Sequence, residues 1–562
     1  MISLAHLDLS SNRLEGGIPK SFSNLSRLQS LDLYFNKLND SLSTIIQVLF
    51  GSMENSLLEF LQLSRNQLRG SLPNNISFPR LTDLHLDCNL LDGSFPETFG
   101  QPLWTLSRRI GQLPKLEVLD VNSNHLEGLV FAAHLSNLSR LQFLDLSLNS
   151  LVLKFNSGWI PPFHLDTIRL RSCKLGPHFP KWLQTQKNVS VLDISAAGIS
   201  ATIPSWFWDL SPRMRLLNIS YNHINGIMPD LSLKFPAFPA IDLSSNHFAG
   251  PIPFLRRTAT SLNLSKNKFS GSLGSISKLK VLQFRNNSFT GELPLPLRNC
   301  INLIIIDLGD NRISGTIPTW IGESLSMLVV FSLRSNEFHG SIPTNFCQLN
   351  NIQILDLSLN NISGTIPMCL DNFLAMTQTL RFDPTIYVIY DQTYTIRDGE
   401  EGYYSPHYVL SALLVWKGRE YEYKNTLGLV KSIDLSSNKL TGEIPSNITR
   451  LVGLVAMNFS RNRLAGPMPA EIGDLKLLES LDLSRNQLSG GIPISLSNLN
   501  FLSHLDLSDN NLSGRIPLST QLQSLDNSTF VGNLNFVGHH LQKCAQEMKH
   551  LRIQKDQMAL MA

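Results

Sequence analysis

Residues Leu303 to Pro318 read "LIIIDLGDNRISGTIP", and nearly the same stretch recurs from one end of the chain to the other. "LAHLDLSSNRLEGGIP" (Leu4 to Pro19) and "LSHLDLSDNNLSGRIP" (Leu502 to Pro517) follow the same template, LxxLxLxxNxLxGxIP. A repeat of fixed period overrides a domain count based on length alone. The 562 residues therefore predict a stack of small repeated units.

We count nineteen copies of the template, most of them 23 to 25 residues apart. Their anchor positions are Asn12, Asn36, Asn66, Asn89, Asn124, Asn149, Cys173, Ala197, Asn222, Asn246, Asn267, Asn287, Asn311, Asn336, Asn360, Asn438, Asn462, Asn486 and Asn510. This period and pattern define leucine-rich repeats. Each LxL triplet predicts a short strand with its two leucines inward and the residue between them outward. The predicted fold is an α/β-type repeat solenoid with a parallel β-sheet on its concave face.

The other template positions have physical roles as well. The anchor Asn points into the coil, where its amide can bond backbone groups that the bend leaves unpaired. Cys173 is an accepted variant in that position, whereas Ala197 offers no polar group, so we expect a looser coil there. The Gly of GxIP permits a tight turn, and its Pro fixes φ where no ladder hydrogen bond is needed.

Composition excludes several classes of function. The net charge is +3 with 16% charged residues, and no run of Lys or Arg suggests nucleic-acid binding. The six cysteines form no CxxC or metal-like spacing, and nothing predicts a cofactor or a metal. We find no signal peptide and no apolar stretch long enough to span a membrane.

Thirteen Asn-x-Ser/Thr sequons favour an extracellular glycoprotein, although repeats rich in Asn and Ser also generate sequons by chance. They lie at Asn24, Asn39, Asn75, Asn137, Asn188, Asn218, Asn263, Asn286, Asn361, Asn447, Asn458, Asn511 and Asn527.

The array is interrupted once, between the repeats anchored at Asn360 and Asn438. This island, residues 368–429, holds eight of the ten tyrosines: Tyr387, Tyr390, Tyr394, Tyr403, Tyr404, Tyr408, Tyr421 and Tyr423, together with Trp416. Such a composition suits a recognition surface. A structural brace between two rigid blocks and a disordered insertion are the alternatives. The predicted divisions are repeats over 1–367, the island, four repeats over 430–517, a degenerate cap over 518–544 and a disordered tail over 545–562.

The LxGxIP extension resembles plant extracellular leucine-rich repeats. The island, followed by "YKNTLGLVKSIDLSSNKLTGEIP" and four regular repeats, resembles plant receptor-like proteins, in particular the subgroup that recognises fungal ethylene-inducing xylanase. The resemblance implies an ectodomain at the plasma membrane, one membrane helix, and signalling through partner kinases. The family also carries a cysteine pair at "NFCQL" and "MCLDN", and Cys347 and Cys369 would lie on neighbouring coils within disulfide range. Cys88, Cys173 and Cys300 are expected to be buried as small apolar residues.

The chain departs from the family plan at its ends. It begins inside a repeat, and "FVGNLNFVGHHLQKC" has Val537 where the family's cap has its first cysteine, so Cys544 lacks its expected partner. We therefore expect a product truncated at both ends, with fraying terminal coils.

An enzyme is the other class to consider, because Asp occupies the outward position of many strands and would form a column of carboxylates. The Asp belongs to a recurrent LDLS unit, no copy differs from the others, and HExxH, GxSxG and phosphate-binding loops are absent from the sequence. The sequence predicts no catalysis.

Repeats that depart from LDLS predict a ligand site on the concave face, at His85, Asp87, Arg169, Arg171, Tyr221, Gln283, Arg285 and Arg334. Drift on a solvated face is the alternative for each single residue, but Arg and Tyr together suit a protein or peptide ligand. The favoured function is the ligand-binding ectodomain of a pathogen-sensing, kinase-lacking receptor that binds a secreted microbial protein and a co-receptor kinase ectodomain. The alternative is a soluble apoplastic decoy or inhibitor of a microbial wall-degrading enzyme.

Overall fold

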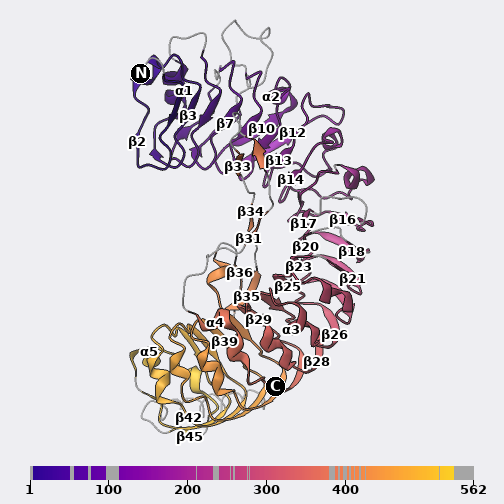
Figure 1. Ribbon diagram of the computed structural model, residues 1–562, viewed down its shortest axis with the longest axis vertical. Helices are drawn as coiled ribbons and strands as arrows, with labels where there is room; N and C mark the ends of the chain where they lie inside the picture. The colour runs from indigo at the N-terminus through magenta and orange to yellow at the C-terminus, as the bar shows by residue number, and fades with distance from the viewer. Residues whose placement is uncertain are drawn as a thin grey trace, which may run out of the picture. The chain divides into compact units, whose positions relative to one another are not determined.

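A computed structural model shows the arrangement of the chain (Figure 1). It describes residues 4–50, 56–73, 78–95, 113–210, 212–231, 239–253, 255–256, 260–274, 276–277, 279–378, 387–389, 393–395, 401–403, 407–409, 412–416, 419–423, 426–517, 519–533 and 535–536. The chain forms two compact units, residues 1–268 and 269–562. This division falls within the predicted first array rather than at residue 367.

The concave sheet of the first unit is built from the predicted LxL triplets. Its parallel strands are β1 (His6–Asp8), β3 (Ser30–Asp32), β5 (Phe60–Gln62), β7 (Asp83–His85), β9 (Val118–Asp120), β11 (Phe143–Asp145), β13 (Thr167–Arg169), β14 (Val191–Asp193), β15 (Leu216–Asn218), β17 (Ala240–Asp242) and β20 (Ser261–Asn263). Leucines of neighbouring repeats pair directly, as Leu61 does with Leu84. Both are buried, so each repeat contributes one layer to a continuous core.

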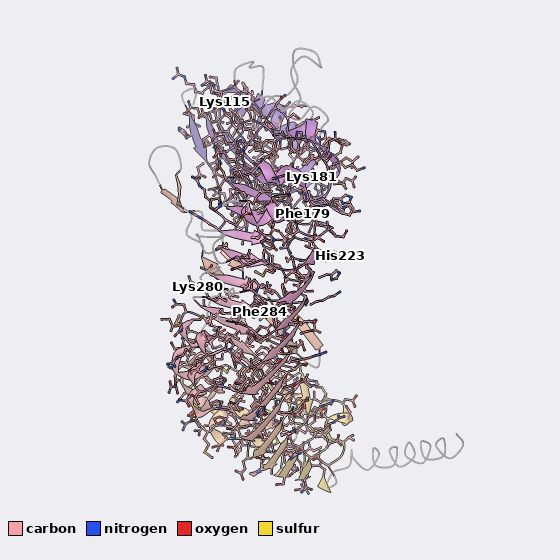
Figure 2. All side chains as sticks on the ribbon, turned by 90° about the vertical axis from the view of Figure 1, so that its right-hand side faces the viewer. Lys115, Phe179, Lys181, His223, Lys280 and Phe284 are labelled. Atoms are coloured by element: carbon pink, nitrogen blue, oxygen red, sulfur yellow. A yellow bond between two sulfur atoms is a disulfide. The ribbon has the colours of Figure 1, made fainter. Side chains whose placement is uncertain are left out.

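The second unit repeats this arrangement with β23 (Val281–Gln283), β25 (Ile305–Asp307), β27 (Val330–Ser332), β29 (Ile354–Asp356), β37 (Ser432–Asp434), β39 (Ala456–Asn458), β41 (Ser480–Asp482) and β43 (His504–Asp506). Phenylalanines replace some of the inward leucines here. Phe284, labelled in Figure 2, is fully buried and its ring lies 5.3 Å from that of Phe289. Larger rings fill the same layered core, and the register of the strands is unchanged.

A left-handed turn follows each of these strands. The residue before every anchor has a positive φ, from Ser11 at 55° to Asp509 at 52°. The anchor amide then bonds the turn: Asn486 Nδ2 donates to the carbonyls of Phe459, Leu483 and Ser484 at 3.0 to 3.2 Å. Its Oδ1 accepts the Leu464 N–H of the preceding coil at 3.0 Å. The nineteen predicted anchors therefore mark the nineteen turns that the structure shows.

The coil at Ala197 is not looser, contrary to the sequence expectation. The Ala197 carbonyl accepts the N–H groups of Leu175 (2.9 Å) and Gly176 (3.1 Å), replacing the missing side-chain acceptor. The next anchor, Asn222, accepts both the Ala197 and the Ile199 N–H groups at 3.0 Å. A Cβ on Gly176 would lie 1.8 Å from the Gly198 carbonyl oxygen, so glycine permits this close approach.

Behind the concave strands, the LxG segments form a second set of short strands. They are β2 (Glu15–Gly16), β4 (Lys37–Leu38), β6 (Arg69–Gly70), β8 (Leu90–Leu91), β10 (Glu127–Phe131), β12 (Ser150–Lys154), β16 (Asn225–Gly226), β18 (His247–Pro251), β21 (Lys268–Gly271), β24 (Ser288–Gly291), β26 (Arg312–Thr316), β28 (Glu337–Ser341), β30 (Asn361–Thr365), β38 (Lys439–Gly442), β40 (Arg463–Gly466), β42 (Gln487–Gly491), β44 (Asn511–Gly514) and β45 (Asn535–Phe536). Strands β19 (Leu255–Arg256) and β22 (Ile276–Ser277) follow the turns of their coils and pair with each other. In the second unit β24, β26, β28, β30, β38, β40, β42, β44 and β45 pair in that order.

Short helices occupy the return segments of the coils. They are η1 (Lys20–Asn24), α1 (Leu42–Phe50), α2 (Ala132–Leu135), η2 (Lys181–Thr185), η3 (Ser205–Asp209), η4 (Leu295–Asn299), α3 (Trp320–Ser324), η5 (Thr344–Gln348), η6 (Leu370–Asn372), α4 (Leu374–Thr377), η7 (Leu427–Leu429), η8 (Ser446–Arg450), η9 (Ile472–Asp474), η10 (Ile494–Asn498), α5 (Thr520–Gln523) and η11 (Asn527–Phe530). Several begin at the Pro of GxIP, whose carbonyl accepts the first helical bond, as Pro294 does from Leu297 at 3.0 Å. Among the described residues no helix has the length and apolar character needed to cross a lipid bilayer.

The island forms antiparallel hairpins within the second unit. Strand β31 (Tyr387–Ile389) pairs with β34 (His407–Val409), β32 (Thr393–Thr395) with β33 (Glu401–Tyr403), and β35 (Ala412–Trp416) with β36 (Arg419–Tyr423). The repeat then resumes in the same frame, since Leu355 of β29 pairs with Ile433 of β37. The Ile362 N–H donates to Asn438 Oδ1 across 76 residues, where the usual separation is 22.

Candidate functional site: the concave face

The outward side chains of the concave strands form one row along each unit, which we call the outward row. In the first unit it runs Asp8, Asp32, Gln62, His85, Asp120, Asp145, Arg169, Asp193, Asn218, Asp242 and Asn263; in the second it runs Gln283, Asp307, Ser332, Asp356, Asp434, Asn458, Asp482 and Asp506. Most of its aspartates accept the N–H two residues later, as Asp356 Oδ1 does from Ser358 at 3.0 Å. The recurrent Asp of LDLS is thus a turn-capping residue.

Burial and neighbouring carboxylates raise the pKa of some aspartates in the outward row. Burial raises the pKa of Asp434 to about 7, and the neighbouring Asp356 charge adds to this shift. In the first unit, burial raises the pKa of Asp145 to about 6 against the opposing effect of Arg169, whose Nη1 lies 3.8 Å from its carboxylate. The row carries more acid than its few arginines balance.

Arg285 forms a deeply buried ion pair with Asp307 in the second unit. Its Nε donates to Asp307 at 3.0 Å, its Nη1 to Asp310 at 2.7 Å and its Nη2 to Ser332 Oγ at 3.1 Å. Gly309 makes room for the guanidinium, because a Cβ there would lie 2.6 Å from its central carbon. Arg285 is only 3% exposed, so it supports the sheet and has no surface to offer a ligand.

Arg334 has the equivalent position two repeats further along the chain. Its Nη1 donates to Ser358 Oγ at 2.6 Å and lies 3.5 Å from Asp434 and 3.9 Å from Asp356. Gln283, also predicted to contact a ligand, is buried. Arg285 and Arg334 therefore stabilise the sheet of this unit through hydrogen bonds to neighbouring repeats. Gln283 and Arg285 are buried, which does not fit the expectation that they contact a ligand.

In the first unit the predicted residues remain accessible. Tyr221 is 51% exposed in the left-handed position before its anchor. Arg169 lies partly exposed over the ring of Phe143, at 5.7 Å, and Arg171 is also partly exposed two residues further on. A polar and aromatic surface is thus available beside the row in this unit.

The first residues of four successive strands in the second unit form an apolar stripe on the same face: Val281, Ile305, Val330 and Ile354. Hairpin β35–β36 covers this stripe. Ala412 and Leu414 are 3% and 4% exposed within the cluster, and Tyr423 packs at its edge. An uncovered stripe of this kind would be an adhesive patch, so the hairpin completes the fold while it occupies the concave face.

Only part of the predicted tyrosine surface lies in the described side chains. Tyr421 is 45% exposed, on the same strand as the packed Tyr423. Tyr387, Tyr394, Tyr403, Tyr408 and Trp416 lie in strands whose backbone alone is described, and Tyr390 and Tyr404 lie outside the described residues. The island therefore combines an anchored side with an exposed aromatic residue at Tyr421.

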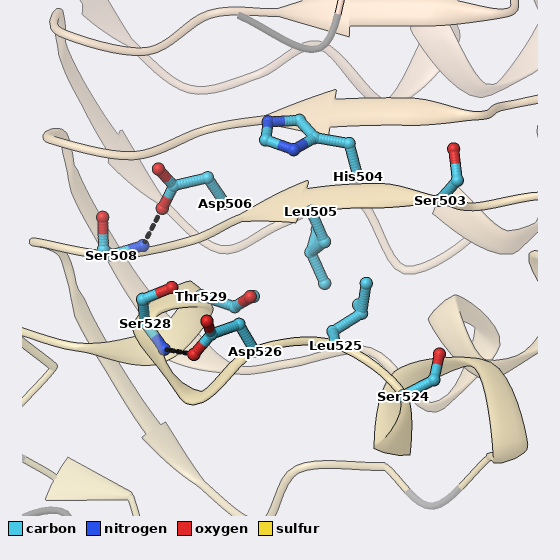
Figure 3. A pocket seen from close by; sticks show the side chains of 10 residues that line it. All are labelled: Ser503, His504, Leu505, Asp506, Ser508, Ser524, Leu525, Asp526, Ser528 and Thr529. Carbon is cyan, nitrogen blue, oxygen red and sulfur yellow. Dashed lines mark hydrogen bonds between the residues drawn. The ribbon is translucent and has the colours of Figure 1, made fainter.

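A polar hollow of about 410 Å³ lies beside the last concave strand (Figure 3). His504 and Asp506 of β43 line one side, and Asp526 and Ser528 of the following coil line the other. That coil continues the ladder, since the Leu507 N–H donates to the Thr529 carbonyl at 2.8 Å. Val537 and Cys544, and with them the prediction for the cap, lie outside the described residues.

The five cysteines in the described part of the chain divide into one pair and three thiols. Cys347 of η5 and Cys369 before η6 form a disulfide with Cα atoms 5.6 Å apart. Cys173 and Cys300 are buried thiols, and Cys88 is partly exposed. Cys173 Sγ lies 3.2 Å from the Leu146 carbonyl, where an anchor amide would otherwise donate.

The sequons differ in access to solvent. The acceptor Asn is exposed at Asn24, Asn39, Asn137, Asn188, Asn286, Asn361 and Asn511, and partly exposed at Asn263, Asn447 and Asn458. Asn218 is buried in the outward row, and its amide bonds Asp193 at 3.2 Å and the Ser220 N–H at 3.1 Å. A glycan there would break these bonds. The side chains of Asn75 and Asn527 are outside the described set.

Sequence reasoning missed the partners of the arginines and the cover of the apolar stripe. The sequence does contain a signal for the partners of Arg285. In the repeat with "LGDN", Gly309 replaces the serine of other repeats and lies between Asp307 and Asp310. The stripe was also readable, as four consecutive repeats with an aliphatic residue in an outward position.

Comparison with known proteins agrees with this architecture. The family model described as Leucine Rich Repeat matches residues 3–25, 57–78, 278–300, 302–324, 351–373, 429–451, 477–499 and 501–522. Receptor-like protein EIX2 of Solanum lycopersicum is 42% identical over 97% of this chain and 63% of its own length. Receptor-like protein EIX1 of the same species is 41% identical over 58% of this chain and 36% of its own length.

Among solved structures, the ectodomain of the Arabidopsis thaliana membrane receptor kinase GASSHO1/SCHENGEN3, in complex with CASPARIAN STRIP INTEGRITY FACTOR 2, is similar with a TM-score of 0.60. It is 26% identical, over 95% of this chain and 59% of that one. The chain thus spans less than two thirds of the length of these relatives. Its repeats, its island and its likeness to the EIX proteins show that it belongs to the plant leucine-rich-repeat receptor-like proteins, in the EIX subgroup.

Proposed function

We propose that this chain is the ligand-binding ectodomain of a pathogen-sensing receptor-like protein, that it lies at the extracellular face of the plasma membrane, and that it binds a secreted microbial protein or peptide. The observation that carries the proposal is the hairpin β35–β36 held on the concave face by Ala412 and Leu414 with Tyr421 exposed. An aromatic side chain on an anchored support loses little conformational freedom when it binds, which suits a recognition element.

The first unit supplies the complementary part of the proposal. Arg169, Arg171 and Tyr221 are accessible on or beside its concave sheet, and such residues are enriched in the cores of protein interfaces. The proposed ligand is a folded, secreted microbial protein. A fungal ethylene-inducing xylanase is the probe that represents it in the experiments. The proposed function is binding without catalysis.

The test is the affinity of the purified chain for the immobilised xylanase. Saturable binding is expected, and Arg171→Glu should weaken it at least tenfold, because a reversed charge in an interface leaves a partner unpaired. Arg140→Glu is the matched control, since it makes the same charge change at an exposed residue outside the concave sheet. Absence of saturable binding, or equal losses in both variants, would overturn the proposal.

Recruitment of a co-receptor kinase ectodomain is the second part of the proposal. The four repeats anchored at Asn438, Asn462, Asn486 and Asn510 are the most uniform, and a constant surface suits a shared partner. Deleting residues 383–424 would uncover the apolar stripe at Val281 and Ile305, so point changes are the cleaner test. Tyr421→Ala should reduce co-receptor capture in the presence of xylanase and leave it unchanged in its absence.

The same assay distinguishes the soluble inhibitor. Inhibition of xylanase activity by stoichiometric amounts of the chain would favour that alternative. Binding without inhibition supports the receptor.

A further inference from the structure

Three possible metal ligands meet on the concave face of the first unit. His85 ends strand β7, Asp87 follows it by two residues, and Asp120 ends the neighbouring strand β9. One ligand atom of each lies within 4.8 Å of those of the other two. The strand register places His85 directly beside Asp120, so the cluster is fixed by the sheet itself.

The surroundings orient these side chains but leave coordination positions open. Asp120 Oδ1 accepts the Asn122 N–H at 3.1 Å and its Nδ2 at 2.6 Å, and Oδ2 makes none of the hydrogen bonds found in the described part of the chain. The Ser64 hydroxyl donates to Asp87 Oδ1. The His85 ring packs on Phe60 at 5.7 Å, and neither of its nitrogens is hydrogen-bonded to a described residue.

The charges at this position favour a cation. Asp87 and Asp120 place two carboxylates beside the His85 imidazole on the same face of the sheet. Among the described residues no Lys or Arg forms an ion pair with Asp87 or Asp120, and Arg169 lies closest to Asp145, one strand further along.

We propose that His85, Asp87 and Asp120 bind one divalent transition-metal ion, with Zn²⁺ as the reference ion. One imidazole nitrogen with two carboxylates is a donor set of Zn²⁺ and of similar first-row ions, whereas Ca²⁺ and Mg²⁺ prefer oxygen ligands alone. Ligands about 2.1 Å from an ion lie at most about 4.2 Å apart, so small side-chain rotations close the site. The site links β7 to β9, and it is independent of which microbial protein the chain binds.

The test uses the full chain, stripped of metal with a chelator and titrated with Co²⁺, whose visible absorption changes when it passes from water into a protein site of lower coordination number. The wild type is expected to bind one Co²⁺ at this site, Zn²⁺ should displace it, and Ca²⁺ should not. His85→Gln should weaken binding more than about 100-fold, since even the loss of an outer partner costs 10–100-fold. His504→Gln, a change at another histidine of the concave sheets that also lies near an aspartate, should leave the affinity unchanged.

A second control separates this site from other histidines. His223 and His247 stack with ring centroids 5.7 Å apart and are an alternative pair for adventitious binding. The proposal is overturned if Co²⁺ does not bind, or if binding is lost in His223→Gln and kept in His85→Gln. Equal unfolding midpoints of the wild type and His85→Gln without metal establish that the variant is folded.

Discussion

Replacing Asp434 by Asn should stabilise the protein at neutral and higher pH. In the unfolded chain this carboxyl titrates near 3.8, whereas burial beside Asp356 raises its pKa in the folded protein to about 7. The folded state therefore binds this proton more tightly, and its stability falls as pH rises from about 4 to about 7, then stays level. The full shift corresponds to about 4 kcal/mol as an upper limit. We expect a gain of about 1–3 kcal/mol at pH 8, because the surroundings relax around the charge.

The chain itself shows that Asn fits this position. Asn458, the next residue of the outward row, accepts the Ser460 N–H at 3.1 Å, as Asp434 Oδ1 accepts the Ser436 N–H at 2.9 Å. Arg334 keeps its hydrogen bond to Ser358 at 2.6 Å when the Asp434 charge is removed. The substitution thus changes charge with little change in shape.

The assay is urea unfolding at about pH 4.5 and about pH 8, compared through the midpoints. The wild-type midpoint should fall between these values more than that of Asp434→Asn. Asp482→Asn is the matched control, because Asp482 caps its turn through the same bond to Ser484, at 3.0 Å, and is only partly buried. An unchanged pH dependence in Asp434→Asn, or lower stability than the wild type at pH 8, would refute the reasoning.

Three other substitutions test the framework of the second unit. Asn486→Ala should lower the free energy of unfolding by about 2–4 kcal/mol and speed amide exchange at Leu464, which loses its acceptor. The backbone cannot compensate as it does at Ala197, because the counterpart of Gly176 in this coil is Ala465, whose Cβ prevents the close approach. Unchanged stability and exchange would show that the anchor amide is dispensable. Leu414→Asp should release hairpin β35–β36, seen as faster proteolysis there and increased dye binding to the apolar stripe, whereas unchanged protection would mean that the stripe does not hold it. Cys347→Ser should lower stability by about 3 kcal/mol for a 22-residue loop, and equal midpoints with and without reductant in the wild type would argue against this contribution.

The repeat itself could be predicted from the sequence because its determinants are local. Each LxL strand, left-handed turn and anchor amide is specified within one template, so Asn311 has the same role as Asn486. Ala197 escaped prediction because its compensation comes from Gly176, one coil earlier, and needs the close approach of two backbones.

The candidate site could be predicted less well, because it depends on which residues neighbouring coils bring together. Arg285 resembled a ligand contact until strand register placed Asp307 beside it, 22 residues later. Because Arg285 is buried, its role is to stabilise the sheet. Arg171 is partly exposed and Tyr221 is 51% exposed, so both remain on the surface.

The role of the island required tertiary information as well. Its composition left recognition, bracing and disorder as alternatives, and the described hairpin β35–β36 shows that one part packs on the sheet through Leu414. Bracing and recognition are compatible, because Tyr421 on the partner strand is exposed.

The most direct test of the central claim, recognition by the concave face, is amide hydrogen exchange of the full chain with and without bound xylanase. The proposal predicts slower exchange in the concave strands around Arg169 and Tyr221 and in the hairpin strand that carries Tyr421. Exchange in the return helices, such as η8 and η10, should be unchanged. Protection confined to those helices, with none in the concave strands, would contradict the claim.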